Sequence, residues 1–402
     1  MKRLTVKLHG ERIATISGYD DEFETHDFAP ERAWLRRPQH PVLGKMWEDR
    51  GPRPLTTHGL TPWFEHILPR GQLRRAIARE AKIDEGDGLS LLSWLSDDLL
   101  GAVTAEIAPD LPYVLSPNPL MVAGEEARYR CSLPGNQWKL SLAEGSSGYT
   151  LPARGEDAAW IAKVPSGDCP RLVEVEAATM AWAAASGVVV PEVREESIDH
   201  LGALPDDLHC PEGKVYLIRR FDRSPAGRVH CEDFGQILDT PPGPRQFASH
   251  YEHIAAVLVR LCPPADLRAF VRQLVFCILA GNCDAHTKNW SVLYPDQRHA
   301  RLSPAYDLVA TIVYPQFDKE LALHLAGHKA LTPLECTRFE PMARATRLDL
   351  KVLWSWVCED VESTLRAWGD PDVYERFTRF ERKRICDHLG RCAGKGFLAN
   401  TP

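Results

Sequence analysis

The residues with the clearest chemical potential lie in a polar segment of the C-terminal half. Asp284 and Asn289 stand five positions apart, and Asp307 follows after a stretch that alternates like a short hairpin. Sites that transfer a phosphoryl group use a carboxylate to accept a hydroxyl proton, and an amide and a second carboxylate in this order to hold magnesium. We therefore interpret Asp284 as a candidate general base, and Asn289 and Asp307 as candidate ligands of Mg²⁺.

The same loop contains two further polar side chains, His286 and Lys288, directly after a helix predicted to be buried. Polar groups at such a position need partners or a function. His286 is structural or positions a phosphate, and Lys288 either stabilises the charge of the transferred group or faces water. Taken alone, Asp284 and Asn289 could also be capping residues.

Upstream, Lys163 ends an apolar strand, where a lysine is paired or reaches out to solvent. In kinase chemistry such a lysine neutralises nucleotide phosphates and pairs with a helix glutamate. Glu176 on the next helix is the predicted partner, with Glu174 as competitor, and an ordinary surface ion pair is the alternative.

A loop that contains Gly135 and Gln137 precedes this strand. Because glycine has no side chain to obstruct the approach, its backbone N–H groups can come close to phosphate oxygens. A plain surface turn is the alternative. The order of loop, lysine, Asp284, Asn289 and Asp307 favours phosphoryl transfer.

Composition limits the other classes. The chain has 402 residues, 44% hydrophobic and 26% charged, and a net charge of −7, which argues against a general nucleic-acid or membrane binder. No apolar run approaches the length that spans a bilayer, and the start lacks a signal-peptide core. The 11 cysteines are an odd number without paired spacing, so we expect reduced thiols in the cytoplasm.

The pattern along the chain predicts the elements that position the site. We expect strands at residues 4–8, 12–16, 139–142, 160–164, 215–221, 290–293 and 299–302, and helices within 60–80 with a break at Gly71, and at 88–103, 173–186, 251–261 and 267–280. A proline-rich connector runs from Pro109 to Pro119. Strand-rich sequence followed by helix-rich sequence predicts an α+β, two-lobed, protein-kinase-like fold. The predicted domains are 1–120, a mixed 121–228 and a helical 229–402.

These motifs together resemble the HipA-type serine/threonine kinases, the toxins of HipBA toxin–antitoxin modules. The resemblance rests on Ser132-x-x-Gly135-x-Gln137-x-Lys139, Lys163, Arg220-Phe221-Asp222-Arg223, His230-x-Glu232-Asp233-Phe234, Gly281-Asn282-x-Asp284-x-His286-x-Lys288-Asn289, Ala305-Tyr306-Asp307 and, near the N-terminus, Phe64-Glu65-His66-Ile67-Leu68-Pro69-Arg70-Gly71. It therefore covers most of the chain.

The resemblance implies ATP and Mg²⁺ as cofactors and a HipA-type N-terminal subdomain at 1–120. It implies that Gly135 and Gln137 belong to the ATP-covering loop of the 121–228 lobe, that Phe221 lies near the adenine, and that Ser132 is autophosphorylated. It further implies a helix-turn-helix antitoxin of HipB type as partner, contact with DNA only through that antitoxin, and an aminoacyl-tRNA synthetase as protein substrate.

Two other functions share these motifs. One is a kinase-shaped, non-catalytic co-repressor of a DNA-binding antitoxin, which the basic stretches Arg70–Arg79 and Arg376–Arg391 would serve, although solvated helix faces are the preferred interpretation. The other is a small-molecule kinase. In the second stretch, the spacing of Phe377, Phe380 and Leu389 predicts a last helix docked on the body.

Overall fold

The structure, a computed structural model, describes residues 2–19, 24–108, 138–146, 148–152, 158–165, 167–202, 204, 208–317 and 319–393. The chain divides into two compact units. The first comprises residues 1–167, 196–242 and 293–298, and the second comprises 168–195, 243–292 and 299–402. Within the described residues, none of the helices combines the length and the apolar character that a membrane-spanning helix needs.

The first unit contains two mixed layers of strands and short helices. Its N-terminal part consists of β1 (Lys2–Leu8), β2 (Glu11–Gly18), β3 (Thr25–Pro30), α1 (Arg32–Leu35), α2 (Lys45–Arg50), β4 (Leu55–His58), α3 (Pro62–Glu65), α4 (Gly71–Ala81), α5 (Gly88–Trp94) and β5 (Val103–Ile107). The remainder consists of β6 (Trp138–Gly145), β7 (Gly148–Thr150), β8 (Trp160–Val164), β10 (Lys214–Arg219), β11 (Arg223–Ser224), β12 (Gly227–Arg228), β13 (His230–Asp233) and α7 (Phe234–Ile237).

The first sheet has the order β4-β3-β2-β1-β5, and each pair of neighbouring strands is antiparallel. The β1–β2 hairpin turns through His9 and Gly10, both with positive φ (51° and 80°), which matches the right-handed twist of the two strands. The predicted hairpin at the start of the chain is therefore confirmed.

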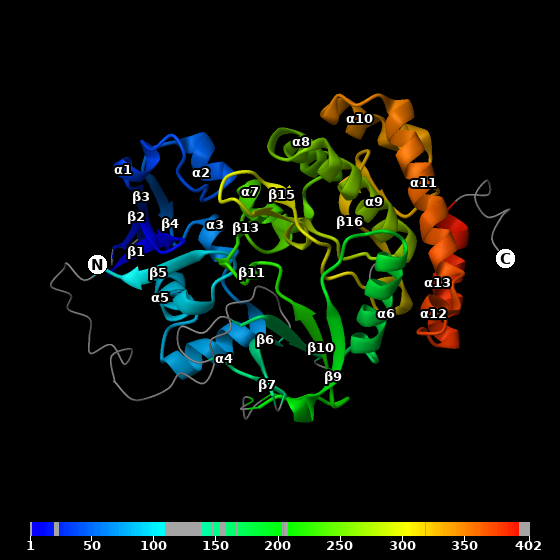
Figure 1. Cartoon of the computed structure of the whole chain (residues 1–402), viewed down its shortest axis with the longest axis horizontal. Helices are drawn as coiled ribbons and strands as arrows, with labels where there is room; N and C mark the ends of the chain where they lie inside the picture. The colour runs from blue at the N-terminus through cyan, green and yellow to red at the C-terminus, as the bar shows by residue number, and fades with distance from the viewer. Residues whose placement is uncertain are drawn as a thin grey trace. The chain divides into compact units, whose positions relative to one another are not determined.

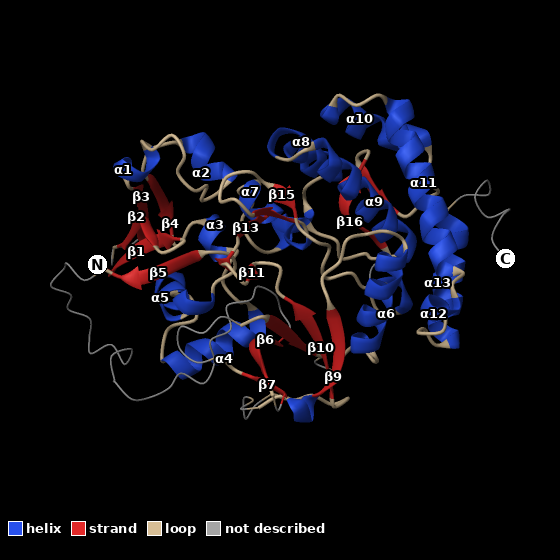
Figure 2. Ribbon diagram, viewed as in Figure 1, coloured by secondary structure: helices blue, strands red, loops and turns tan. Residues whose placement is uncertain are grey.

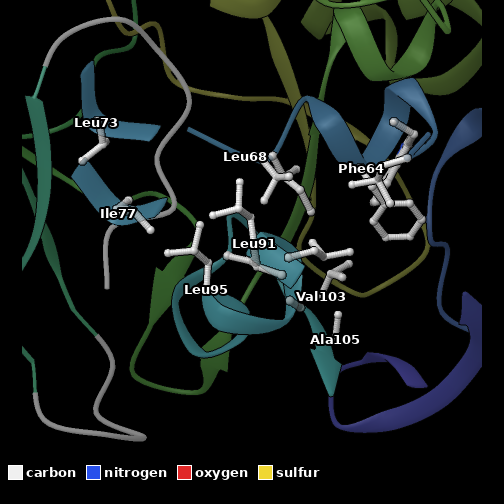
Figure 3. Packing of buried hydrophobic residues seen from close by; sticks show 14 of the residues in the cluster. Phe64, Leu68, Leu73, Ile77, Leu91, Leu95, Val103 and Ala105 are labelled. Carbon is white, nitrogen blue, oxygen red and sulfur yellow. The ribbon is translucent and has the colours of Figure 1, made fainter. Parts of the chain in front are cut away.

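The core of the first unit joins this sheet to the second one. A single buried cluster includes Val6 of β1, Leu92 of α5, and Trp160 and Leu217 of the second sheet. Figure 3 shows part of this cluster, where Leu91 and Leu95 lie against the apolar face of α4 that carries Leu73 and Ile77.

The second sheet of the first unit carries Lys163. Its strands β7, β6, β8 and β10 are neighbours in this order, and Lys163 of β8 is opposite Lys139 of β6 and Tyr216 of β10. The boundary between the units falls within β9 (Val193–Ser197), next after β10 in the sheet order, and within β14 (Ser291–Tyr294).

The second unit is mainly helical, as Figure 2 shows. It contains α6 (Leu172–Ala185), α8 (Tyr251–Leu261), α9 (Pro264–Ala280), β15 (Arg301–Leu302), β16 (Glu320–Leu325), β17 (His328–Ala330), α10 (Glu340–Thr346), α11 (Leu350–Trp368), α12 (Pro371–Tyr374) and α13 (Arg379–Cys392). Helix α9 is buried over most of its surface and packs against α8, α11 and α13 (Figure 1).

Two details of the predicted elements are wrong. The helix predicted over 88–103 ends at Trp94, and residues 103–107 form strand β5, which pairs with β1 because alternate residues Val103 and Ala105 are buried. The last helix is present, but Phe380 is 59% exposed, while Phe377 and Leu389 are buried. Phe377 precedes α13, and within the helix the exposed Phe380 and the buried Leu389 occupy different faces.

Candidate active site

The loop with Asp284 begins where the buried helix α9 ends. Gly281 follows the helix with a φ of +68°, a conformation that glycine adopts without steric cost. A Cβ atom at this position would lie 2.6 Å from the Cβ of Ile312, so the close approach of the two segments also requires glycine. The end of α9 thereby fixes the start of the loop against residues 311–313.

Asn282 ties the loop to the Asp307 segment. Its side-chain oxygen accepts a hydrogen bond from the N–H of Asp284 at 3.1 Å, and its side-chain nitrogen donates to the carbonyl of Asp307 at 3.4 Å. Asn282 itself is 2% exposed, so its side chain is buried while its partners reach toward the surface. One buried amide therefore sets the separation of the candidate base and a candidate metal ligand.

The amide of Asn289 has a defined orientation. Its Nδ2 donates to the main-chain carbonyl of Asp284 at 2.8 Å, which directs Oδ1, the atom that can bind a cation, to the other side. Asn289 is 7% exposed and Asp284 is exposed. This difference in burial suits Asn289 as a residue that holds an ion and Asp284 as an acid that a substrate can reach.

Asp307 has a positive φ of +53°, which is uncommon for a residue other than glycine and is found at functional sites more often than elsewhere. Its neighbours hold it in place. The hydroxyl of Tyr306 donates to the carbonyl of Lys288 at 2.7 Å, and Thr311 accepts from the N–H of Cys283 at 2.8 Å. The side chains of Tyr306, Thr311 and Asn282 thus join the Asp307 segment to the Asp284 loop.

Two buried aromatic residues form hydrogen bonds with the loop. The Tyr251 hydroxyl and the Trp290 indole N–H both donate to the carbonyl of Ala285, at 3.2 and 3.1 Å. The ring of His286 packs edge-on against Phe247, with centroids 5.0 Å apart. His286 therefore has a packing role whether or not it also contacts phosphate. Lys288 is half-buried and contributes its carbonyl to the Tyr306 bond.

Helix α6 reaches the same segment. Thr179 accepts a hydrogen bond from the N–H of Ala310 at 3.1 Å, and Glu176 lies one turn earlier on the same face of the helix. Glu176 is 3% exposed, which excludes the ordinary surface position considered above. Its competitor Glu174 is half-buried and lies 3.7 Å from Arg171.

Lys163 and Phe221 belong to the first unit. Lys163 is 7% exposed, and its Nζ lies 5.4 Å from the centroid of the Tyr216 ring, which stabilises the charged form by a cation–π contact. Phe221 is half-buried. The pairing of Lys163 with Glu176 stays a prediction. Ser132, Gly135 and Gln137 lie outside the described residues.

The donor set can be tested against the predicted Mg²⁺. Among the described residues, no three histidine, cysteine or acidic side chains gather to form a metal site of their own. Magnesium is bound in proteins by one or two side-chain oxygens together with phosphates and water, so a site of Asn289 and Asp307 fits this ion. It does not fit a structural zinc, which takes four protein ligands.

Arg220 and Asp222 form a buried charged cluster in the first unit. The sequence motif contains both residues, but the sequence assigned them no role. Arg220 donates to both carboxylate oxygens of Asp222 at 2.9 Å and to Asp98 at 2.7 Å. Asp222 also accepts from the N–H of Gly101 at 2.8 Å and from Arg223 at 2.8 Å. The cluster binds the N-terminal subdomain to the second sheet, and is structural.

The role of Asn282 was also missed. The sequence contains one signal for it, an asparagine directly after the glycine that ends a buried helix. A short side chain at this point can reach both its own loop and a neighbouring segment. Its second partner, the carbonyl of Asp307, is 25 residues away and has no side-chain signature.

Fold and site define a mixed α/β chain of the protein-kinase-like class. The HipA N-terminal domain model matches residues 4–106, and the HipA-like C-terminal domain model matches residues 131–368. A relative from Sinorhizobium fredii, "Putative kinase Y4dM", is 33% identical over 373 residues, with 91% of each chain covered. A second from the same organism, "Putative kinase Y4mE", is 26% identical with 85% of each covered.

Among solved structures, the chain is similar to that of HipA in a complex of HipA, HipB and operator DNA from Shewanella oneidensis. The TM-score is 0.72 at 19% sequence identity, with 96% of each chain covered. The chain belongs to the HipA family. The predicted family and α+β, kinase-like fold class are therefore confirmed.

Proposed function

We propose that this protein is an ATP-dependent serine/threonine protein kinase and the toxin of a toxin–antitoxin module. One observation carries the proposal: Asn282 and Asn289 hold the main chain of Asp284 between them, and Asn282 also holds that of Asp307. A phosphoryl-transfer site requires a general base and metal ligands held in fixed positions, because its catalysis consists mainly of positioning and charge stabilisation. Here the candidate base and the two candidate Mg²⁺ ligands share one network of hydrogen bonds.

Each residue then has a defined role. Asp284 orients the substrate hydroxyl and accepts its proton. Asn289 and Asp307 would hold Mg²⁺, which neutralises charge on the phosphates when bound. Lys163 would hold phosphate oxygens of ATP, with Glu176 as its ion-pair partner.

The remaining assignments follow the family resemblance. Gly135 and Gln137 would cover the phosphates, Phe221 would contact the adenine, and His286 and Lys288 would line the phosphate side of the site. We assign His286 the positioning role because its ring is already fixed against Phe247.

Partners follow the same resemblance. The solved relative is in complex with HipB and operator DNA, which supports a HipB-type, helix-turn-helix antitoxin here and contact with DNA through it. The proposed protein substrate is translation-related, an aminoacyl-tRNA synthetase. Phosphoproteomics after induced expression, with Asp284→Gln as the inactive reference, identifies it. The synthetase assignment fails if no synthetase site depends on Asp284.

We propose that Ser132 is phosphorylated by the enzyme itself. A phosphoserine adds about −1.5 to −2 charge, which repels the phosphates of ATP and so lowers activity. The intact mass after incubation with Mg-ATP should increase by one phosphate in the wild type and stay unchanged in Ser132→Ala. An equal increase in both proteins removes Ser132 from the mechanism.

The decisive test of the kinase activity is Asp284→Asn with labelled ATP. Loss of a general base reduces transfer by about 10²–10⁴-fold, whereas ATP binding should remain. Glu362→Gln, an exposed carboxylate on α11 changed to an amide in the same way, is the matched control and should keep wild-type activity. Transfer at the wild-type rate in Asp284→Asn contradicts the assignment, and no transfer by the wild type favours a non-catalytic co-repressor.

A further inference from the structure

Three basic side chains gather on the surface of the second unit. Lys319 directly precedes β16, and Arg384 and Arg391 lie two turns apart on one side of α13. Lys319 and Arg391 are exposed and Arg384 is half-buried. Partial desolvation, together with the nearby charges of Arg384 and Arg391, lowers the pKa of Lys319. The three therefore form one positive surface, named the basic ledge here.

The basic ledge lies beside the Asp284 loop. Arg384 donates to the carbonyl of Ile312 at 3.0 Å, and the N–H of Ile312 donates to the carbonyl of Gly281 at 3.0 Å. On the other side, the backbone of Glu320 is within hydrogen-bonding reach of the Cys283 thiol. Cys283 is the residue before Asp284. The ledge therefore adjoins the loop both through α13 and through the start of β16.

The charge of the ledge is not neutralised within the described part of the chain. None of its three cations has a carboxylate oxygen within 4 Å there. Of the acids next to it in sequence, Glu320 and Asp387 are described and neither pairs with it, whereas Asp318 lies outside the described residues. Like charges held together without partners repel one another, which an anionic partner relieves.

Exposed aromatic rings accompany the cations. Phe380 is 59% exposed, and the guanidinium of Arg384 lies over its ring at 5.6 Å from the centroid. Phe317, two residues before Lys319, is 44% exposed. Exposed aromatic residues beside arginine are enriched in protein–protein contacts, and here they flank the ledge on both segments.

We propose that the basic ledge binds an acidic segment of the protein substrate and so presents a nearby serine or threonine to Asp284. This rests on the proposed kinase function. A protein segment suits the ledge better than nucleic acid does, because duplex binders neutralise several phosphates along a continuous stripe, whereas this surface offers three cations and two aromatic rings.

Binding is tested first, by fluorescence anisotropy at physiological ionic strength. The probes are a labelled peptide of glutamate and glycine with one serine, the same peptide with lysine in place of glutamate, and a labelled DNA duplex. The wild type should prefer the glutamate peptide. Lys319→Glu/Arg391→Glu should weaken its binding about tenfold or more, and added salt should weaken the wild type.

Two further variants exclude general effects. Arg260→Glu/Lys351→Glu makes the same change in charge on α8 and α11 of the same unit, at exposed positions, and should bind like the wild type. Lys319→Arg/Arg391→Lys keeps the charges and should also bind like the wild type. Equal binding by the ledge variant and the wild type overturns the proposal, as does tighter binding of the DNA or of the lysine peptide.

Phosphate transfer to the glutamate peptide is then measured separately. The ledge variant should raise KM for the peptide about tenfold with kcat unchanged. Binding of the peptide without any transfer contradicts the kinase function and leaves the ledge as a docking surface. Transfer with the same KM in the ledge variant contradicts the docking and leaves the kinase function in place.

Discussion

Two polar clusters of this molecule look alike in sequence and differ in what surrounds them. In the first unit, Asp222 is 1% exposed and accepts hydrogen bonds from two arginines and from the N–H of Gly101. In the second unit, Asp284 is exposed, and its N–H and C=O are both held by asparagine amides. The first cluster uses its carboxylate to connect parts of the fold, and the second positions a carboxylate at the surface.

The difference shows that burial, rather than residue type, decides between structure and chemistry. Burial by itself disfavours the charge of Asp222, yet Arg220 and Arg223 lower its pKa well below the usual range. An acid so firmly ionised and enclosed cannot accept a proton from a substrate. An exposed acid whose main chain is held by hydrogen bonds can.

Arg220→Met should give the largest effect and act on stability. It leaves two carboxylates, Asp98 and Asp222, buried without their main cation, which costs about 3–5 kcal/mol of unfolding free energy. By comparison, Asp284→Asn should change the unfolding free energy by less than about 0.5 kcal/mol, because its side chain is exposed. Urea unfolding of both variants measures the contrast, and equal effects would mean that the two clusters do not differ as described.

Asn282→Ala should affect activity strongly. The buried amide that aligns Asp284 with Asp307 is lost, and residues that orient ligands in this way contribute about 10–100-fold to activity. Because the variant keeps every proposed reacting group, kcat should fall while the peptide KM stays constant. Wild-type kcat with a reduced unfolding temperature would make Asn282 a structural residue only.

Glu232 in the first unit gives a smaller, pH-dependent effect. It is fully buried, and burial raises its pKa to about 8. The hydrogen bond from the Lys45 N–H acts in the opposite direction and only partly offsets this increase. Between the ordinary pKa of 4.5 and 8, the folded protein keeps a proton that the unfolded chain has released. The stability contributed by this group therefore falls as the pH rises through that window, by at most about 1.4 kcal/mol per pH unit.

Glu232→Gln should remove this contribution to the pH dependence. Unfolding free energies at pH 5.5 and 7.5, compared with those of wild type and Glu362→Gln, provide the measurement. A slope as steep in Glu232→Gln as in the wild type means that another group titrates.

Much of the architecture could be predicted from local patterns. Helix α8 begins and ends as its apolar spacing predicts, and α9 ends at Ala280 because the next residue, Gly281, takes a left-handed conformation. Strand β5 was missed because Val103 and Ala105 are buried by pairing with β1, far away in sequence. Phe380 differs from the prediction because helical spacing alone does not distinguish an aromatic residue on the buried face from one on the exposed face.

The site shows the same division. The spacing of Asp284, Asn289 and Asp307 could be recognised because it reflects the chemistry directly. The bonds of Asn282 and Tyr306 could not, because each ends on a main-chain carbonyl of a distant segment, which any residue type supplies. A hydrogen bond to a main-chain carbonyl therefore cannot be recognised from the type of residue that supplies the carbonyl.

The most direct test of the account is calorimetric binding of Mg-ATP to Asp307→Ala and Asp284→Asn. If Asp307 holds the metal and Asp284 acts only on the substrate hydroxyl, the first variant loses Mg-ATP binding and the second keeps wild-type affinity. Wild-type affinity in Asp307→Ala, or an equal loss in both variants, would contradict the assignment of a base and a metal ligand to one frame.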